Sequence, residues 1–202
     1  MTHAAPVLLD RADVEPGGSA VTWYEFLLFV HVAFAIIWIG GGFLFQVYGL
    51  VELRSGDTAA IARFAGNAGR IGERLFTPAS LLVVLAGVGL MIEGSWSWGL
   101  LWVDFALVAF IGSFLVGIGF LGPTAKRIEA VGPETAEGQH LIRKVFAVLR
   151  VDLLFLFAIV FAMTVKPTGD DVGIVLVVAA ILVAGTLFFL RDVVRAQPAP
   201  AR

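Results

Sequence analysis

Long apolar blocks alternate with short charged segments along the chain. Five of these blocks carry almost no charge, and they cover residues 26–51, 75–92, 100–122, 145–165 and 172–190. Each is close to the roughly 20 residues that a helix needs to cross about 30 Å of hydrocarbon. Because lipid offers no partner for backbone N–H and C=O groups, apolar blocks of this length must be helical. The pattern predicts an all-α integral membrane protein, a helical bundle of about five transmembrane helices in contact with the lipid bilayer.

Lysine and arginine are distributed unevenly among the segments between these blocks. They gather after the first, third and fifth blocks, whereas residues 94–99 carry none and the connection after the fourth block carries only Lys166. Cytoplasmic segments of membrane proteins carry the excess of positive charge. The distribution therefore predicts that the N-terminus lies outside and the C-terminus inside, with both long connections in the cytoplasm.

The composition agrees with a membrane protein and excludes several classes of function. Of the 202 residues, 59% are hydrophobic and 15% are charged, whereas about a quarter of a soluble domain is charged. The net charge of −2 gives no reason to expect a nucleic-acid partner. The absence of cysteine excludes disulfides, thiolate metal sites and cysteine nucleophiles.

The chain divides into three parts. Residues 1–22 hold acidic and basic side chains where a signal peptide would have its apolar core, so we expect a disordered N-terminal tail. Residues 23–191 form the five-helix transmembrane domain, and residues 192–202 form a cytoplasmic C-terminal tail. The location expected for such a chain is the bacterial cytoplasmic membrane, as a multi-pass protein.

Several short segments mark the ends of the predicted spans. The tryptophans between residues 96 and 102 lie at the predicted outer face, together with Trp23, as in an aromatic belt. Pro123 and Pro167 are each predicted to end a span, because proline cannot continue a helix. Residues 58–69 have the pattern of a short amphipathic helix, which we expect to lie on the membrane surface.

The polar residue that is most unusual for its place is His31, roughly 8 Å inside the outer end of the first span. Polar groups at such depth are costly and mark candidate functional sites. Helical spacing places Trp38 on the same face as His31, and the glycines from Gly40 to Gly42 leave bare backbone beyond it. The first span therefore predicts a groove that accommodates a flat cofactor or a partner helix.

Three interpretations of His31 remain open at this stage. In the first, His31 is an axial haem ligand, and Met91, Met163 or an open position supplies the other side. In the second, the same imidazole and thioethers bind copper, because both suit Cu(I). In the third, His31 bonds a neighbouring helix, the methionines fill gaps and Asp104 pairs with Lys166. His140 lies in a predicted cytoplasmic connection, so one chain offers no two-histidine site in the membrane.

Two charged residues lie near the predicted start of the fourth span. Arg150 is expected to extend its guanidinium to the membrane interface. Asp152 is expected to be stabilised by the helix macrodipole, because it lies near the predicted helix N-terminus. Both are interpreted as structural.

The first span also carries a family pattern. From His31 to Gly41 the chain reads His-Val-Ala-Phe-Ala-Ile-Ile-Trp-Ile-Gly-Gly, which resembles the first helix of a DUF-type family of predicted integral membrane proteins from bacteria. The segment from Arg150 to Asp152, with the later stretch from Met163 to Thr168, is similar to a late helix of that family. With the five-span layout, the resemblance covers most of residues 24–190.

More distantly, the chain is similar to the copper-resistance D membrane domain, to haem-J-type protoporphyrinogen oxidase and to the membrane part of cytochrome-type urate oxidase. In several of these proteins the first-helix histidine serves haem or metal binding, a role that the resemblance assigns to His31. It implies a haem-associated redox protein that binds haem b, with Trp38 and Gly41 shaping the pocket and with a redox partner or a second copy of the chain. The alternative is a copper-handling or partner-subunit bundle without enzymatic activity.

Overall fold

The structure, a computed structural model, describes residues 21–195, with side chains placed to Phe189 and at Arg191. The predicted disordered tail falls almost wholly on residues 1–20, which lie outside the described residues, as do residues 196–202. Thr22 begins the ordered helix: its hydroxyl accepts a hydrogen bond from the Glu25 N–H, and the Glu25 side chain accepts one from the Thr22 N–H. This reciprocal capping satisfies backbone donors that the first helical turn leaves free.

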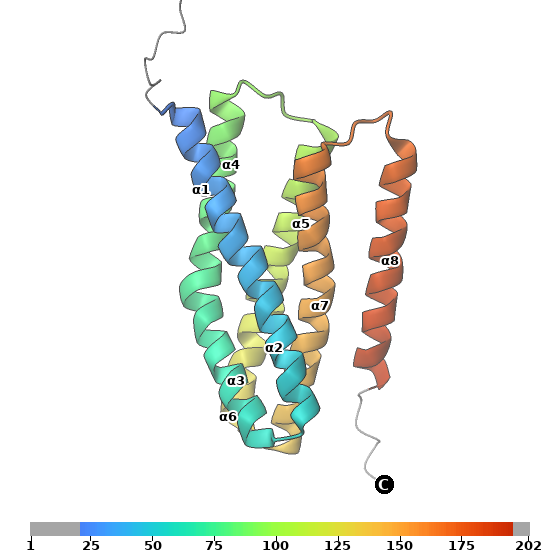
Figure 1. Cartoon of the computed structure of the whole chain (residues 1–202). Helices are drawn as coiled ribbons and strands as arrows, with labels where there is room; N and C mark the ends of the chain where they lie inside the picture. Colours follow the sequence, from blue (N-terminus) through green and yellow to red (C-terminus); the bar gives the residue numbers. More distant parts are fainter. Residues whose placement is uncertain (1–20, 196–202) are drawn as a thin grey trace, which may run out of the picture.

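The described chain forms five rods, and all five are long and apolar enough to cross a membrane (Figure 1). Three rods consist of two α-helices joined by a π-helical turn. Their segments are α1 (Trp23–Ala35), η1 (Ile36–Gly40) and α2 (Gly41–Ser55); α3 (Thr58–Ile71), η2 (Gly72–Phe76) and α4 (Thr77–Glu93); and α5 (Leu101–Val116), η3 (Gly117–Leu121) and α6 (Gly122–Val131). The last two rods are α7 (Ala136–Val165) and α8 (Val172–Arg195). The predicted all-α bundle of five spanning helices is confirmed.

The connections divide between two opposite ends of the bundle. The start of α1 and the segments 94–100 and 166–171 lie at one end, which we call the tryptophan end (Figure 1). The turns at residues 56–57 and 132–135 and the end of α8 lie at the other, which we call the basic end. This alternation matches the predicted topology, in which the basic end faces the cytoplasm.

The best-packed core lies toward the basic end. Ile61 and Phe64 from α3, Ile128 from α6, and Ile142 and Phe146 from α7 form one buried cluster. Phe64 stacks on Phe146 with ring centroids 5.8 Å apart. Stacked aromatic pairs add stability beyond the area that they bury, so this cluster ties three rods together.

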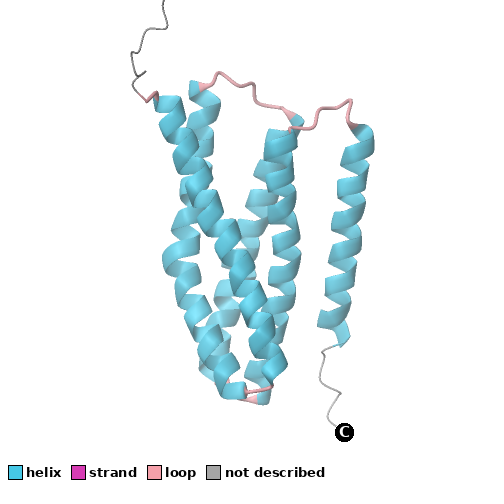
Figure 2. Ribbon diagram, viewed as in Figure 1, coloured by secondary structure: helices cyan, strands magenta, loops and turns pink. Residues whose placement is uncertain are grey.

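Toward the tryptophan end the rods separate into two pairs. There α1 packs along α4, and α5 packs along α7, and Figure 2 shows the two pairs diverging toward this end. The fifth rod, α8, packs mainly on α7. Gly185 of α8 allows this approach, because a Cβ there would lie 2.5 Å from a methyl carbon of Leu154.

The helix at residues 58–71 does not lie on the membrane surface, as the amphipathic pattern predicted. It runs through η2 into α4 as one rod, and its apolar side chains Ile61 and Phe64 are 3% and 7% exposed in the core. An amphipathic pattern fixes which face of a helix is buried. Here that face is covered by the other helices of the bundle and not by lipid headgroups.

Pro123 does not end the third span, which is a second correction to the sequence-based expectation. The rod continues to Val131, because the wide turn η3 precedes the proline and the Gly122 N–H donates to the Gly117 carbonyl five residues back. Proline is tolerated in the first turn of a helix, where its missing N–H is not needed. Pro167, by contrast, does follow the end of α7.

Candidate functional site

His31 lies at the interface between α1 and α4. Its Nδ1 is 2.8 Å from the carbonyl oxygen of Val83, and the side chain is half-buried. A carbonyl can only accept a hydrogen bond, so Nδ1 must carry the proton. The neutral ring then has its lone pair on Nε2, which has no hydrogen-bond partner among the side chains and backbone that the structure describes.

Gly87 of α4 makes room for the imidazole. A Cβ at this position would lie 3.2 Å from Cε1 of His31 and 3.3 Å from its Nδ1, which is tighter than most real contacts. One turn of helix separates Val83 from Gly87, so the Val83 carbonyl and the Gly87 backbone both contact the imidazole of His31. Neither residue could be predicted from the sequence, because their pairing with His31 depends on the register between α1 and α4.

The other two predicted pocket residues contact different neighbours. The Trp38 ring meets Phe110 of α5 edge-on, with centroids 5.6 Å apart. Gly41 accommodates the Phe76 ring, whose Cε1 would lie 2.6 Å from an added Cβ. The π-turn η1 lies between His31 and Gly41 and changes the angular spacing along the rod. His31, Trp38 and Gly41 therefore point toward three different elements.

The two candidate methionines lie in different helix pairs. Met91 of α4 is 8% exposed and follows Gly87 by four residues, about 6 Å along the helix axis. Met163 is half-buried in the last turns of α7. Met91 therefore belongs to the same helix pair as His31, whereas Met163 belongs to the α5–α7 pair.

Lys166 does not pair with Asp104. Its Nζ lies 4.6 Å from the Trp96 ring centroid and 5.2 Å from that of Trp102. Among the residues with described side chains, the ion pair found is Arg127 with Glu137, at the basic end. Cation–π contacts replace the predicted salt bridge and join the two connections of the tryptophan end.

Asp152 is not near a helix N-terminus, contrary to the sequence-based expectation. Helix α7 begins at Ala136, four turns earlier than Asp152, and the macrodipole acts only within about the first turn. The Asp152 side chain instead lies half-buried in the middle of α7, the helix that packs along α5. The Arg150 guanidinium lies over the Phe189 ring of α8, 5.7 Å from its centroid.

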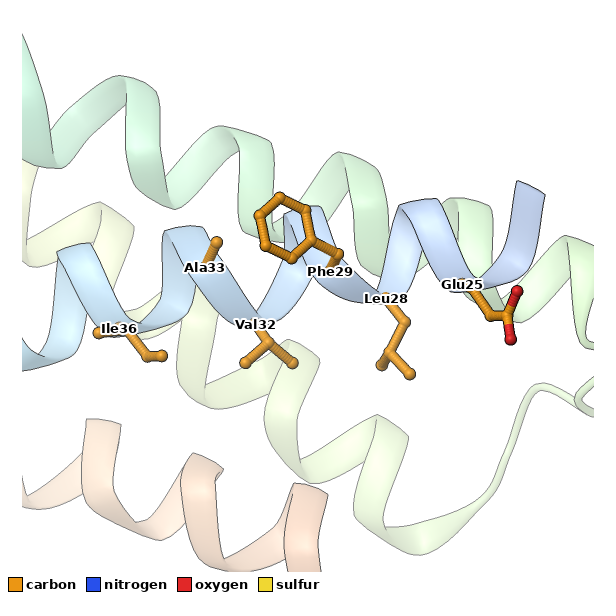
Figure 3. Close-up of a pocket in the computed structure, with 6 residues that line it drawn as sticks. All are labelled: Glu25, Leu28, Phe29, Val32, Ala33 and Ile36. Carbon is orange, nitrogen blue, oxygen red and sulfur yellow. The ribbon is translucent and has the colours of Figure 1, made fainter. Parts of the chain in front are cut away.

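A shallow hollow of about 360 Å³ lies along α1, apart from His31 (Figure 3). Its lining comes from the first rod alone, from α1 and the first residue of η1: Glu25, Leu28, Phe29, Val32, Ala33 and Ile36. Phe29 and Ile36 are 69% and 66% exposed, which is expected of a surface that faces lipid tails. The hollow is therefore a feature of the lipid-facing surface.

The family model described as "Predicted integral membrane protein (DUF2269)" matches residues 25–167. The chain belongs to this DUF2269 family. No curated protein and no solved structure matches.

The matched range has a clear relation to the fold. It begins in the first turn of α1 and ends at Pro167, so it contains His31 and the first four rods and excludes α8. Within the described residues, no group of three or more His, Asp or Glu side chains is arranged to hold a metal ion. In this DUF2269 protein, a metal or haem iron would therefore depend on His31 and a small number of other donors.

Proposed function

We propose that this DUF2269 protein is a haem-associated redox protein of the bacterial cytoplasmic membrane, with His31 as an axial ligand of haem b. The observation that supports the proposal is the hydrogen bond from His31 Nδ1–H to the Val83 carbonyl. Histidines that ligate metals usually donate their other ring N–H to a carbonyl or carboxylate, which orients the ring and raises the basicity of the ligating nitrogen. His31 has this arrangement before any ligand is present.

The chain provides one well-oriented axial ligand for a haem iron, His31, and a less well-defined second ligand. Val83 fixes the tautomer, and Gly87 leaves room for the ring. Met91 offers a buried thioether in the same helix pair, whereas His140 lies at the basic end of α7. The proposal therefore takes Met91, an open position or His31 of a second copy as the other ligand. A bound haem would supply one-electron chemistry, and Trp38 and Gly41 would shape the helix beside it.

The deciding experiment is a visible absorption spectrum of the protein purified from haem-replete cells, oxidised and then reduced with dithionite. We expect a Soret band and sharpened α and β bands on reduction, lost in His31→Ala. The matched control is His140→Ala, which removes a histidine at the opposite end and should leave the spectrum unchanged. A featureless spectrum from folded protein would refute the haem proposal.

The second candidate function is that of a copper-handling or partner-subunit bundle. The position of Met91 is the observation that favours copper. A buried thioether in the same helix pair as an available imidazole offers the soft and borderline donors that suit Cu(I). Copper bound at one equivalent, and lost in both His31→Ala and Met91→Leu, would support this function. Copper binding that survives both substitutions would exclude this site.

A further inference from the structure

The first part of the second rod, α3, extends beyond the membrane at the basic end. The rod from Thr58 to Glu93 has 36 residues, about 54 Å, and therefore exceeds the roughly 30 Å of hydrocarbon. Its charged residues locate the spanning part: Glu73 and Glu93 are twenty residues apart, about 30 Å, and residues 75–92 are uncharged. Helix α3 therefore lies outside the hydrocarbon, where its outer face meets water.

The outer face of α3 is basic. One side of the helix is buried in the aromatic core, and the opposite side exposes residues at the i, i+3, i+4 and i+7 positions of a single helix face: Arg63, Gly66, Asn67 and Arg70. We call these four residues the arginine face. Its two guanidinium groups come from positions about 10 Å apart along the helix axis, and α3 itself contains no acidic residue.

The positive charge of this face is not compensated within the described part of the chain. Arg70 donates from Nη2 to Oδ1 of Asn67 at 2.6 Å, which holds its guanidinium on the face. Among the described side chains, no carboxylate lies within ion-pair distance of Arg63 or Arg70. The carboxyl of Asp57 caps the start of α3, and Glu73 lies in η2, at the edge of the hydrocarbon. The two arginines are therefore available to an external anion.

Gly66 lies between the two arginines and leaves the helix backbone uncovered. A Cβ at Gly66 would meet nothing within 4 Å, so packing within the described chain does not require a glycine there. Glycine in a helix interior is less stable than alanine, and it allows another backbone to approach closely. The arginine face thus combines two oriented cations with a bare backbone position between them.

We propose that the arginine face binds an acidic segment of a soluble protein, whose backbone approaches at Gly66 and whose carboxylates pair with Arg63 and Arg70. The planar guanidinium group matches a carboxylate with two parallel hydrogen bonds. Lipid headgroups fit this face less well, because they extend only about 5–8 Å beyond the hydrocarbon, whereas Arg63 is ten residues beyond Glu73, about 15 Å. The face lies at the opposite end from His31, so it is independent of haem binding.

The test is the binding of a fluorescein-labelled decaglutamate peptide to the full-length protein in nanodiscs of neutral phosphatidylcholine, measured by fluorescence anisotropy. Binding should weaken as salt is added, because salt screens exposed charges. Arg63→Gln and Arg70→Gln should each weaken binding by about two- to fivefold, and the double variant by about tenfold. The matched control is Arg143→Gln, which removes an exposed arginine from α7 and should change binding by less than about twofold.

Gly66→Leu separates docking from simple charge attraction, because it keeps both arginines and its side chain enters open space. It should not lower the melting temperature, and it should weaken peptide binding as strongly as the loss of one arginine. The double charge reversal, Arg63→Glu with Arg70→Glu, should lose the decaglutamate peptide and bind decalysine instead. Equal peptide binding by the wild type and the double glutamine variant would overturn the proposal. If native mass spectrometry then shows that this variant retains less phosphatidylglycerol, the face binds lipid and not a protein.

Discussion

The two ends of the bundle are built differently. At the basic end, aromatic and aliphatic side chains from α3, α6 and α7 form a continuous core, and Gln46 of α2 donates from Nε2 to the Phe146 carbonyl at 3.0 Å. Gly49 lets α2 come so close that a Cβ there would overlap the Phe146 ring. At the tryptophan end, two helix pairs diverge, and the contacts between connections are those of Lys166 with Trp96 and Trp102.

The candidate chemistry lies where the rods separate into two pairs, outside the aromatic core. His31 lies in one helix pair and Asp152 in the other, both on the tryptophan side of the Phe146 cluster. The aromatic core joins three rods, whereas each pair toward the tryptophan end packs two. The basic end thus acts as the stable base that holds the two pairs, and the pairs carry the polar groups.

The largest expected effect concerns which end faces the cytoplasm. Because the native chain has no cysteine, single cysteines report accessibility without background. In intact cells, a membrane-impermeant maleimide should label Ser97→Cys at the tryptophan end and leave Ala130→Cys at the basic end unlabelled, until the cells are permeabilised. Labelling of Ala130→Cys in intact cells would reverse the predicted orientation.

The next largest effect is expected from opening the core at the basic end. Phe146→Ala removes a ring that is 4% exposed and stacks on Phe64, so it should lower the free energy of unfolding by about 3–5 kcal/mol. The control is Phe29→Ala, since Phe29 is 69% exposed and should lose less than about 1 kcal/mol. Unfolding of both variants in mixed micelles would measure the difference, and equal losses would show that the core does not dominate stability.

Within the α1–α4 pair, a bulky residue at position 87 should displace the histidine ring. Gly87→Leu places side-chain atoms where His31 lies, so the bond to Val83 should break and haem or metal binding at His31 should be lost. Overpacking of this kind typically costs about 1–3 kcal/mol. Gly112→Leu is the matched control, because a Cβ there meets nothing within 4 Å. If the absorption spectrum is unchanged in Gly87→Leu, the cofactor is not bound through His31.

A smaller effect is expected where the connections meet at the tryptophan end. Lys166→Gln removes the ammonium group above Trp96 and Trp102, and exposed cation–π contacts contribute about 0.5–1 kcal/mol each. The free energy of unfolding should therefore fall by roughly 1–2 kcal/mol, well below the loss in Phe146→Ala. Tryptophan emission should also change, whereas Lys126→Gln at the basic end should leave it unaltered.

The smallest effect concerns the start of α8. Hydrogen bonds from the backbone N–H and the hydroxyl of Thr168 lower the pKa of Asp171. A depressed folded-state pKa contributes stability above the pKa of the unfolded chain, and this contribution is lost as the pH falls through the folded-state value. Carbon-detected NMR of the Asp171 carboxyl should show titration below the ordinary aspartate range, and Thr168→Val should raise its pKa. The same pKa in both proteins would contradict the capping role.

The sequence predicted the spans well and the partners of individual side chains poorly. Residue 31 was singled out because a histidine is costly inside an apolar block. Val83 and Gly87 carry no such signal: one contributes a backbone oxygen, and the other contributes the absence of a side chain. The common face predicted for His31 and Trp38 assumed regular α-helical spacing, which the π-turn η1 changes.

The sequence by itself determined that the chain has five helices that can span a membrane and that His31 lies within the first of them. These follow from the bilayer, which acts on each segment according to its own length and charge. Only the tertiary structure decided that residues 58–71 enter the core, that Pro123 lies within a rod and that α7 begins four turns before Asp152. Contacts of this kind join residues far apart in sequence, and they depend on helix register, which hydrophobic pattern alone does not encode.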